Sequence, residues 1–125
     1  MKNIHGSVQT YGMRFFSSEG TIGYVGDTRF FQELINAYQG VKLLIINTVT
    51  ENKMPDIYHM CVEDAIMLIN GVSPELAILT HFGTSMIDAH PDAMAEKISE
   101  ATGINTVAGR DGMVVRTQIN ADLMV

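Results

Sequence analysis

Residues 76–83 read Leu-Ala-Ile-Leu-Thr-His-Phe-Gly, an apolar run that ends in a histidine and then breaks at a glycine. A short apolar run bounded by turn residues is typical of a strand buried on both faces of a sheet. In open α/β sheets, ligands bind just beyond the carboxyl ends of the strands. We therefore expect His81 to lie at a functional edge of the sheet. The structural alternative is an imidazole that bonds a neighbouring backbone carbonyl.

A second run, residues 21–28, brings an aspartate to a strand end in the same way, because it reads Thr-Ile-Gly-Tyr-Val-Gly-Asp-Thr and ends with Asp27 and Thr28. A helical pattern from Phe30 to Tyr38 follows. The structural alternative for Asp27 is therefore a helix N-cap, a role that Thr28 would fill equally well. Histidine and aspartate are both metal-ligand types, and two strand ends that carry them favour a metal site.

A third candidate, His59, follows the longest polar irregular stretch, residues 51–58. It precedes a predicted helix over 61–69, in which Glu63 and Asp64 fall in the first turn, where the helix dipole favours acidic side chains. His59 at a helix entry is either bonded to backbone or functional, and the pattern leaves both open.

The rest of the chain completes an α/β fold. The pattern predicts a hairpin from 6–16 and 21–25, a buried strand at 41–47, a loop at 83–88, a helix at 90–103, and a second hairpin from 104–108 and 113–117. We expect one domain, residues 1–125, with a mixed β-sheet of about five or six strands and three helices on one face. Three short helices leave the other face bare. The simplest source of a second layer is another copy of the chain.

Composition excludes several classes of function. Lys and Arg number 8 against 14 Asp and Glu, which gives a net charge of -6 without a basic stripe. Autonomous binding to nucleic acid is therefore not expected. The single cysteine, Cys61, forms no intrachain disulfide, and the sequence shows neither a signal peptide nor a long apolar span. We expect a cytoplasmic protein that does not enter a membrane.

Four motifs, considered with their order and spacing, indicate a protein family: Gly-Asp-Thr at 26–28, His-Met-Cys-Val-Glu-Asp-Ala at 59–65, Leu-Thr-His-Phe-Gly at 79–83 and Arg-Asp-Gly-Met at 110–113. With them the chain resembles the metallo-β-lactamase superfamily, closest to the hydrolase branch that includes the tRNA 3′-end nuclease (ribonuclease Z) and phosphodiesterase-like members. The resemblance runs from about Tyr11 to Thr117. It implies the C-terminal half of a four-layer αββα sandwich.

The resemblance also implies roles for the three candidates. Asp27 matches the carboxylate that bridges two metal ions, and His81 matches the last histidine ligand of the second metal. His59 matches a histidine that supports proton transfer near the leaving group. The implied cofactor is a divalent metal, zinc before manganese or iron.

The family's His-x-His-x-Asp-His cluster does not occur in this sequence. A catalytic zinc site needs about three protein ligands and an open position, whereas the matched residues supply two. Three explanations stay open: assembly with a separate N-terminal half, a homodimer through the exposed sheet face near Ile45 or Ile78, or a fold that has lost its chemistry. We expect a half-length metal-dependent hydrolase of phosphodiesters or related esters, inactive as an isolated monomer. The alternative is an inactive structural or protein-interaction module.

Overall fold

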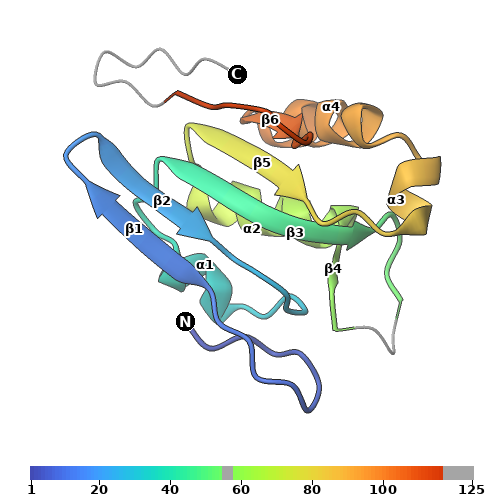
Figure 1. The fold of residues 1–125 in the computed structure, drawn as a ribbon, viewed down its shortest axis with the longest axis horizontal. Helices are drawn as coiled ribbons and strands as arrows, with labels where there is room; N and C mark the ends of the chain where they lie inside the picture. Colours follow the sequence, from blue (N-terminus) through green and yellow to red (C-terminus); the bar gives the residue numbers. More distant parts are fainter. Residues whose placement is uncertain (55–57, 117–125) are drawn as a thin grey trace.

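The secondary structure follows the predicted alternation of strands and helices. A computed structural model describes residues 1–54 and 58–116 (Figure 1). The elements are β1 (Met13–Ser17), β2 (Gly20–Tyr24), α1 (Glu33–Ala37), β3 (Leu43–Thr50), β4 (Met60–Cys61), α2 (Val62–Val72), β5 (Leu76–Thr80), α3 (Thr84–Asp88), α4 (Pro91–Thr102) and β6 (Asn105–Ala108).

The strands form one mixed sheet in the order β1-β2-β3-β5-β6, and the short strand β4 pairs with β3 off this path. β1 and β2 are an antiparallel hairpin, whereas β2, β3, β5 and β6 run parallel. The carboxyl ends of these four parallel strands therefore share one edge. The predicted mixed α/β sheet is confirmed, and at this edge Asp27 follows β2 and His81 follows β5.

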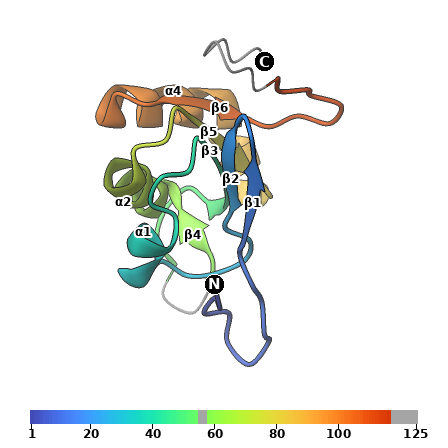
Figure 2. The same ribbon diagram turned by 90° about the vertical axis from the view of Figure 1, so that its left-hand side faces the viewer.

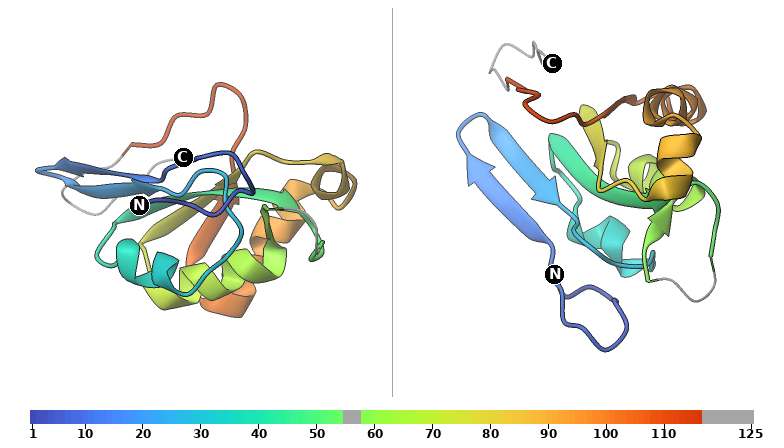
Figure 3. Two further views of the ribbon diagram at one scale, coloured as in Figure 1. Left: turned by 90° about the horizontal axis from the view of Figure 1, so that it is seen from below. Right: turned by 45° about the vertical axis from the view of Figure 1, so that its right-hand side comes forward.

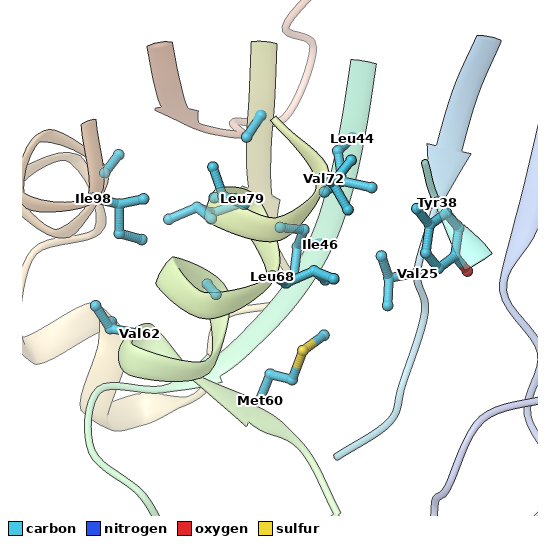
Figure 4. Packing of buried hydrophobic residues seen from close by; sticks show 14 of the residues in the cluster. Val25, Tyr38, Leu44, Ile46, Met60, Val62, Leu68, Val72, Leu79 and Ile98 are labelled. Carbon is cyan, nitrogen blue, oxygen red and sulfur yellow. The ribbon is translucent and has the colours of Figure 1, made fainter. Parts of the chain in front are cut away.

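One face of the sheet is covered by α1, α2 and α4, as predicted (Figure 2 and the left panel of Figure 3). Leu44, Ile46 and Leu79 point from the central strands into this layer and are fully buried. They pack with Tyr38 from the end of α1 and Leu68 from α2 (Figure 4). This single apolar cluster holds the helices on the sheet.

The opposite face, which we call the open face, has no helix on it in the described part of the chain (Figure 3). Its register places Phe15, Ile22, Leu43 and Leu76 in one row across four strands, and Met13, Tyr24, Ile45, Ile78 and Val107 in the next. Met113 and Val115, from the segment after β6, pack on the β5 side of this face. On the β1 side, Met13 and Phe15 remain about half exposed, at 49% and 52%.

Three local predictions are wrong. α1 begins only at Glu33, so neither Asp27 nor Thr28 caps it. Residues 84–88 form the helix α3, where a loop was expected. The sequence did not reveal this helix because Met86 is its one buried side chain, and a single buried position shows no helical period. No second hairpin forms in residues 113–116, where the Met113 N–H instead donates to the Arg110 carbonyl in a turn. Thr117, the last residue of the predicted hairpin, lies outside the described residues.

Among the helices of residues 1–54 and 58–116, none combines the length and the apolar character that crossing a membrane requires.

Candidate metal centre at the carboxyl edge of the sheet

The structure brings the three predicted site residues together. Asp27 follows β2, His81 follows β5, and His59 immediately precedes β4. His81 Nε2 lies 3.6 Å from Asp27 Oδ1, and His59 Nδ1 lies 3.9 Å from the same oxygen. Asp27 is thus the centre of the cluster, with one imidazole on each side.

The Asp27 carboxylate is held by a neighbour from β3. The buried Asn47 side chain donates from Nδ2 to Asp27 Oδ1 at 2.7 Å. Asn47 lies on β3, between the strands that lead to Asp27 and His81, so the order of the parallel strands places the amide beside the carboxylate. An amide donor fixes the orientation of a carboxylate without neutralising its charge. This contact presents Oδ1 toward both histidines.

His81 lies just past β5, where the chain leaves the sheet. Its side chain is 51% exposed, and its backbone φ of 60° lies in the left-handed region that residues with a Cβ seldom adopt. The adjacent Phe82 packs against the main core. The imidazole lies against the Asp27 carboxylate, with Nε2 3.6 Å from Oδ1, and this contact favours the functional interpretation over the structural alternative.

His59 carries a buried ring nitrogen, Nδ1, that has no hydrogen-bond partner in the described part of the chain. Burial lowers the pKa of His59 below its usual value; the Asp27 charge opposes this effect, while His5 and His81 add to it. The lowered pKa favours a neutral imidazole at pH 7, which has a lone pair on one ring nitrogen. Nδ1 of His59 therefore has no backbone partner within the described residues, and the lowered pKa favours the neutral ring.

The start of α2 anchors the segment that carries His59. Asp64 accepts hydrogen bonds from the Cys61 backbone N–H at 3.2 Å and from Lys53 Nζ at 3.3 Å. The Cys61 thiol donates to the same carboxylate at 3.3 Å, and burial raises the pKa of this thiol. The Cys61 side chain also accepts from the Asp64 backbone N–H, which completes a capping box and gives Cys61 a structural role at the helix terminus.

A fourth residue, His5, joins the site and was not predicted. Its ring meets the His59 ring edge-on with centroids 4.7 Å apart, and the His59 and His81 rings lie 5.9 Å apart and stacked. His5 Nδ1 lies 2.9 Å from the Tyr58 carbonyl oxygen. Because a carbonyl only accepts, Nδ1 carries a proton, and in the neutral imidazole the lone pair is then on Nε2. The sequence signal was weak, since His5 stands in a leading segment without periodicity.

The donor atoms fit part of a divalent-metal site. Two ligand atoms that each lie about 2.0–2.1 Å from one tetrahedral ion are about 3.3 Å apart, close to the spacing between Asp27 Oδ1 and His81 Nε2. The unpaired His59 Nδ1 is a buried polar atom that lacks a partner beside them. Across residues 1–54 and 58–116, however, no group of three His, Cys, Asp or Glu side chains is already arranged to hold an ion. The chain therefore presents part of a ligand set.

A mixed sheet with helices on one face, and with carboxylate and imidazole side chains at its carboxyl edge, defines one half of a metallo-β-lactamase fold. The family described as the beta-lactamase superfamily domain matches residues 2–82. The chain belongs to this superfamily, as the four motifs predicted.

The proteins that this chain resembles are longer than it is. The uncharacterized protein MJ1374 of Methanocaldococcus jannaschii is 40% identical over 113 residues, which are 89% of this chain and 42% of that protein. The metallo-beta-lactamase fold protein YhfI of Bacillus subtilis superposes with a TM-score of 0.77 at 20% identity, over 90% of this chain and 46% of YhfI. The short form of human tRNase Z gives 0.70 at 15% identity, over 94% and 42%. The chain spans less than half the length of each of them.

Proposed function

We propose that this chain supplies one half of a divalent-metal-dependent hydrolase that acts on phosphodiesters or related esters. The observation that carries the proposal is the convergence of Asp27 and His81 at 3.6 Å, beside the unpaired Nδ1 of His59, at the carboxyl edge of the sheet. Membership of the superfamily supports the same chemistry.

In this proposal Asp27 and His81 hold the ion, with zinc preferred because of its affinity for imidazole and carboxylate ligands. Bound there, such an ion would supply Lewis acidity for the ester oxygen and would lower the pKa of a bound water. Asn47 would keep the Asp27 carboxylate turned toward the ion. His59, whose Nδ1 lies 3.9 Å from the same carboxylate, would take up a proton from the attacking water and pass it to the leaving-group oxygen. His5 adds an imidazole whose Nε2 has a lone pair. The ligands still needed come from a second chain.

The open face is the proposed interface, and the proposed partner is a second copy of this chain. Phe15, Ile22 and Ile45 lie on it without a charged neighbour in their two rows. Two apolar rows can meet their own copy across a twofold axis without like-charge repulsion, and the nearby Arg110 and Asp111, which line a hollow with Ile45, are of opposite charge. Such a dimer would cover both open faces and would bring two ligand sets into one assembly.

Metal content tests the chemistry. We expect the purified dimer to contain about one zinc ion per chain. Asp27→Asn and His81→Ala should each lower zinc affinity more than about tenfold, since even an indirect supporting residue contributes that much. The matched control is His90→Ala, which removes an exposed histidine at the start of α4. Hydrolysis of bis(4-nitrophenyl) phosphate should fall with the loss of metal. A folded protein that binds zinc equally well in all variants would contradict the proposal.

Light scattering tests the interface. Phe15 and Phe16 are neighbours on β1 with opposite orientations, because Phe15 pairs with Ile22 on the open face and Phe16 pairs with Thr21. Phe15→Asp should yield monomers, while Phe16→Asp should stay dimeric. A wild-type chain that is monomeric at every concentration would rule out the homodimer and would point to a separate half as the source of the missing ligands.

A further inference from the structure

The N-terminal segment, residues 1–12, carries His5 to the site without being part of the sheet's parallel strands. It is attached mainly by hydrogen bonds to residues 25–29, the loop that carries Asp27. Asn3 Nδ2 donates to the Val25 carbonyl at 2.8 Å, and Thr10 Oγ1 donates to the Asp27 carbonyl at 2.6 Å. The loop of Asp27 and the segment of His5 are therefore bonded to each other along their length.

Thr28 occupies the centre of this attachment. Its side chain is almost fully buried, at 1% exposure. The hydroxyl accepts from the Ile4 backbone N–H at 2.9 Å and donates to the Arg29 carbonyl at 2.8 Å. The Arg29 N–H in turn donates to the Ile4 carbonyl at 2.9 Å. Ile4 precedes His5 and Thr28 follows Asp27, so one hydroxyl joins the neighbours of two site residues.

This use of the hydroxyl explains why Thr28 does not cap a helix. α1 begins five residues later, at Glu33, and the Thr28 side chain is already bonded to Ile4 and Arg29. A threonine cap would have oriented only its own helix. The observed bonds instead act across 24 residues of sequence.

We propose that Thr28 is a positioning residue, whose hydroxyl holds His5 against His59 and keeps both in register with Asp27. The inference rests on the proposed metal site for its effect on binding, but the geometric part stands independently. Without the hydroxyl, the half-buried Ile4 N–H loses its acceptor beside a side chain that is almost fully buried, and the segment must shift to find another partner. The His5 ring would then leave its edge-on contact with His59.

The test compares Thr28→Val, which keeps the shape and removes the hydroxyl, with Thr28→Ser, which keeps the hydroxyl. The control is Thr106→Val, because Thr106 is a buried threonine on β6 with a single local hydroxyl bond to the Ile104 carbonyl. Two readouts are used on the full chain: the nuclear Overhauser effect between the His5 and His59 rings without metal, and the affinity for Zn²⁺ by calorimetry.

We expect Thr28→Val to lose the ring–ring signal and to bind Zn²⁺ about tenfold more weakly, as for other residues that orient ligands. Thr28→Ser and Thr106→Val should retain both. A ring–ring signal that persists in folded Thr28→Val overturns the inference. Absence of Zn²⁺ binding in the wild type overturns the proposed function alone, because the ring contact still tests the positioning.

Hydrogen exchange in the wild type decides the matter if Thr28→Val does not fold. The Ile4 amide should exchange far more slowly than the amide of Ser7, which lies in the exposed turn of the same segment. Equal exchange rates would show that Thr28 does not hold the segment, and would overturn the inference.

Discussion

The helix-covered face and the open face of the sheet are built from the same strands and differ in what covers them. Leu44 and Ile46 face the helices and are fully buried, whereas Phe15 and Met13 on the open face are about half exposed. The covered face contains the larger apolar cluster, and the open face contains a small one around Leu43 and Ile78. The difference indicates that the helix-covered face supplies most of the buried core, whereas the open face is buried at its centre, at Leu43 and Ile78, and exposed along β1.

Adjacent residues of β3 give the most direct test of this comparison. Leu44 is buried under the helices and Ile45 lies on the open face. Leu44→Ala should lower the free energy of unfolding by about 3 kcal/mol, because it leaves a cavity in the main cluster. Ile45→Ala should cost about 1 kcal/mol in the monomer. Denaturant unfolding measures both, and equal losses would break the comparison.

Gly12 extends the test to the hairpin that lies over Tyr38. A Cβ at Gly12 would collide with the Tyr38 hydroxyl and lie 3.0 Å from the carbonyl oxygens of Tyr24 and Val25. Gly12→Ala should therefore cost about 2 kcal/mol of stability. Gly109→Ala, whose nearest obstacle is the Leu79 carbonyl at 3.1 Å, should cost less. If Tyr38→Phe restores part of the loss in a double-mutant cycle, the hydroxyl is the main obstacle.

Tyr38 also predicts how the covered face responds to alkali. Burial raises the pKa of Tyr38 to about 12, from 10.0. As pH rises, the phenol ionises in the unfolded chain near pH 10 but in the folded chain only near pH 12. The contribution of Tyr38 to the free energy of unfolding is therefore complete below pH 10 and is lost as pH rises toward 12. By pH 11 the loss should be about 1.4 kcal/mol. Urea unfolding at pH 9 and 11 measures it, and Tyr38→Phe should remove this part of the pH dependence.

The smallest expected effect concerns the edge where α4 meets β6. The Ser99 hydroxyl accepts from the Thr106 N–H at 2.9 Å, on the side of the edge strand where no other strand pairs in the described residues. Ser99→Ala should cost roughly 1 kcal/mol, because the Thr106 N–H loses its partner. Ser18→Ala, in the exposed β1–β2 turn, should have no measurable effect. If Ser99→Ala and Ser18→Ala changed the free energy of unfolding equally, water would be replacing the Ser99 hydroxyl as the acceptor for the Thr106 N–H.

The sequence predicted the elements whose signal is local and strong. β3 and β5 follow from continuous apolar runs, and α2 and α4 follow from helical periodicity with clear ends. α3 was missed because a helix of five residues has too few buried positions to display a period. The start of α1 was misplaced because the Thr28 side chain bonds a segment far away in sequence, which no local pattern reports.

The candidate site was predictable to the same extent. Asp27 and His81 follow strands that the apolar runs identify, so the rule for carboxyl strand ends placed both at one edge. His5 reaches the site through bonds between the N-terminal segment and residues 25–29, and these depend on tertiary structure. The same holds for Asn47, which the sequence presents only as the last residue of an apolar run. Metal binding and partner remain predictions for the experiments above.

The left-handed backbone at His81 has a consequence for how this chain tolerates change. A residue with a Cβ costs about 1–2 kcal/mol more than glycine in that conformation. A sequence optimised only for thermal resistance would therefore place glycine at position 81 and lose the imidazole. At position 81 the chain can therefore have either the more stable backbone, with glycine, or the imidazole side chain, but not both.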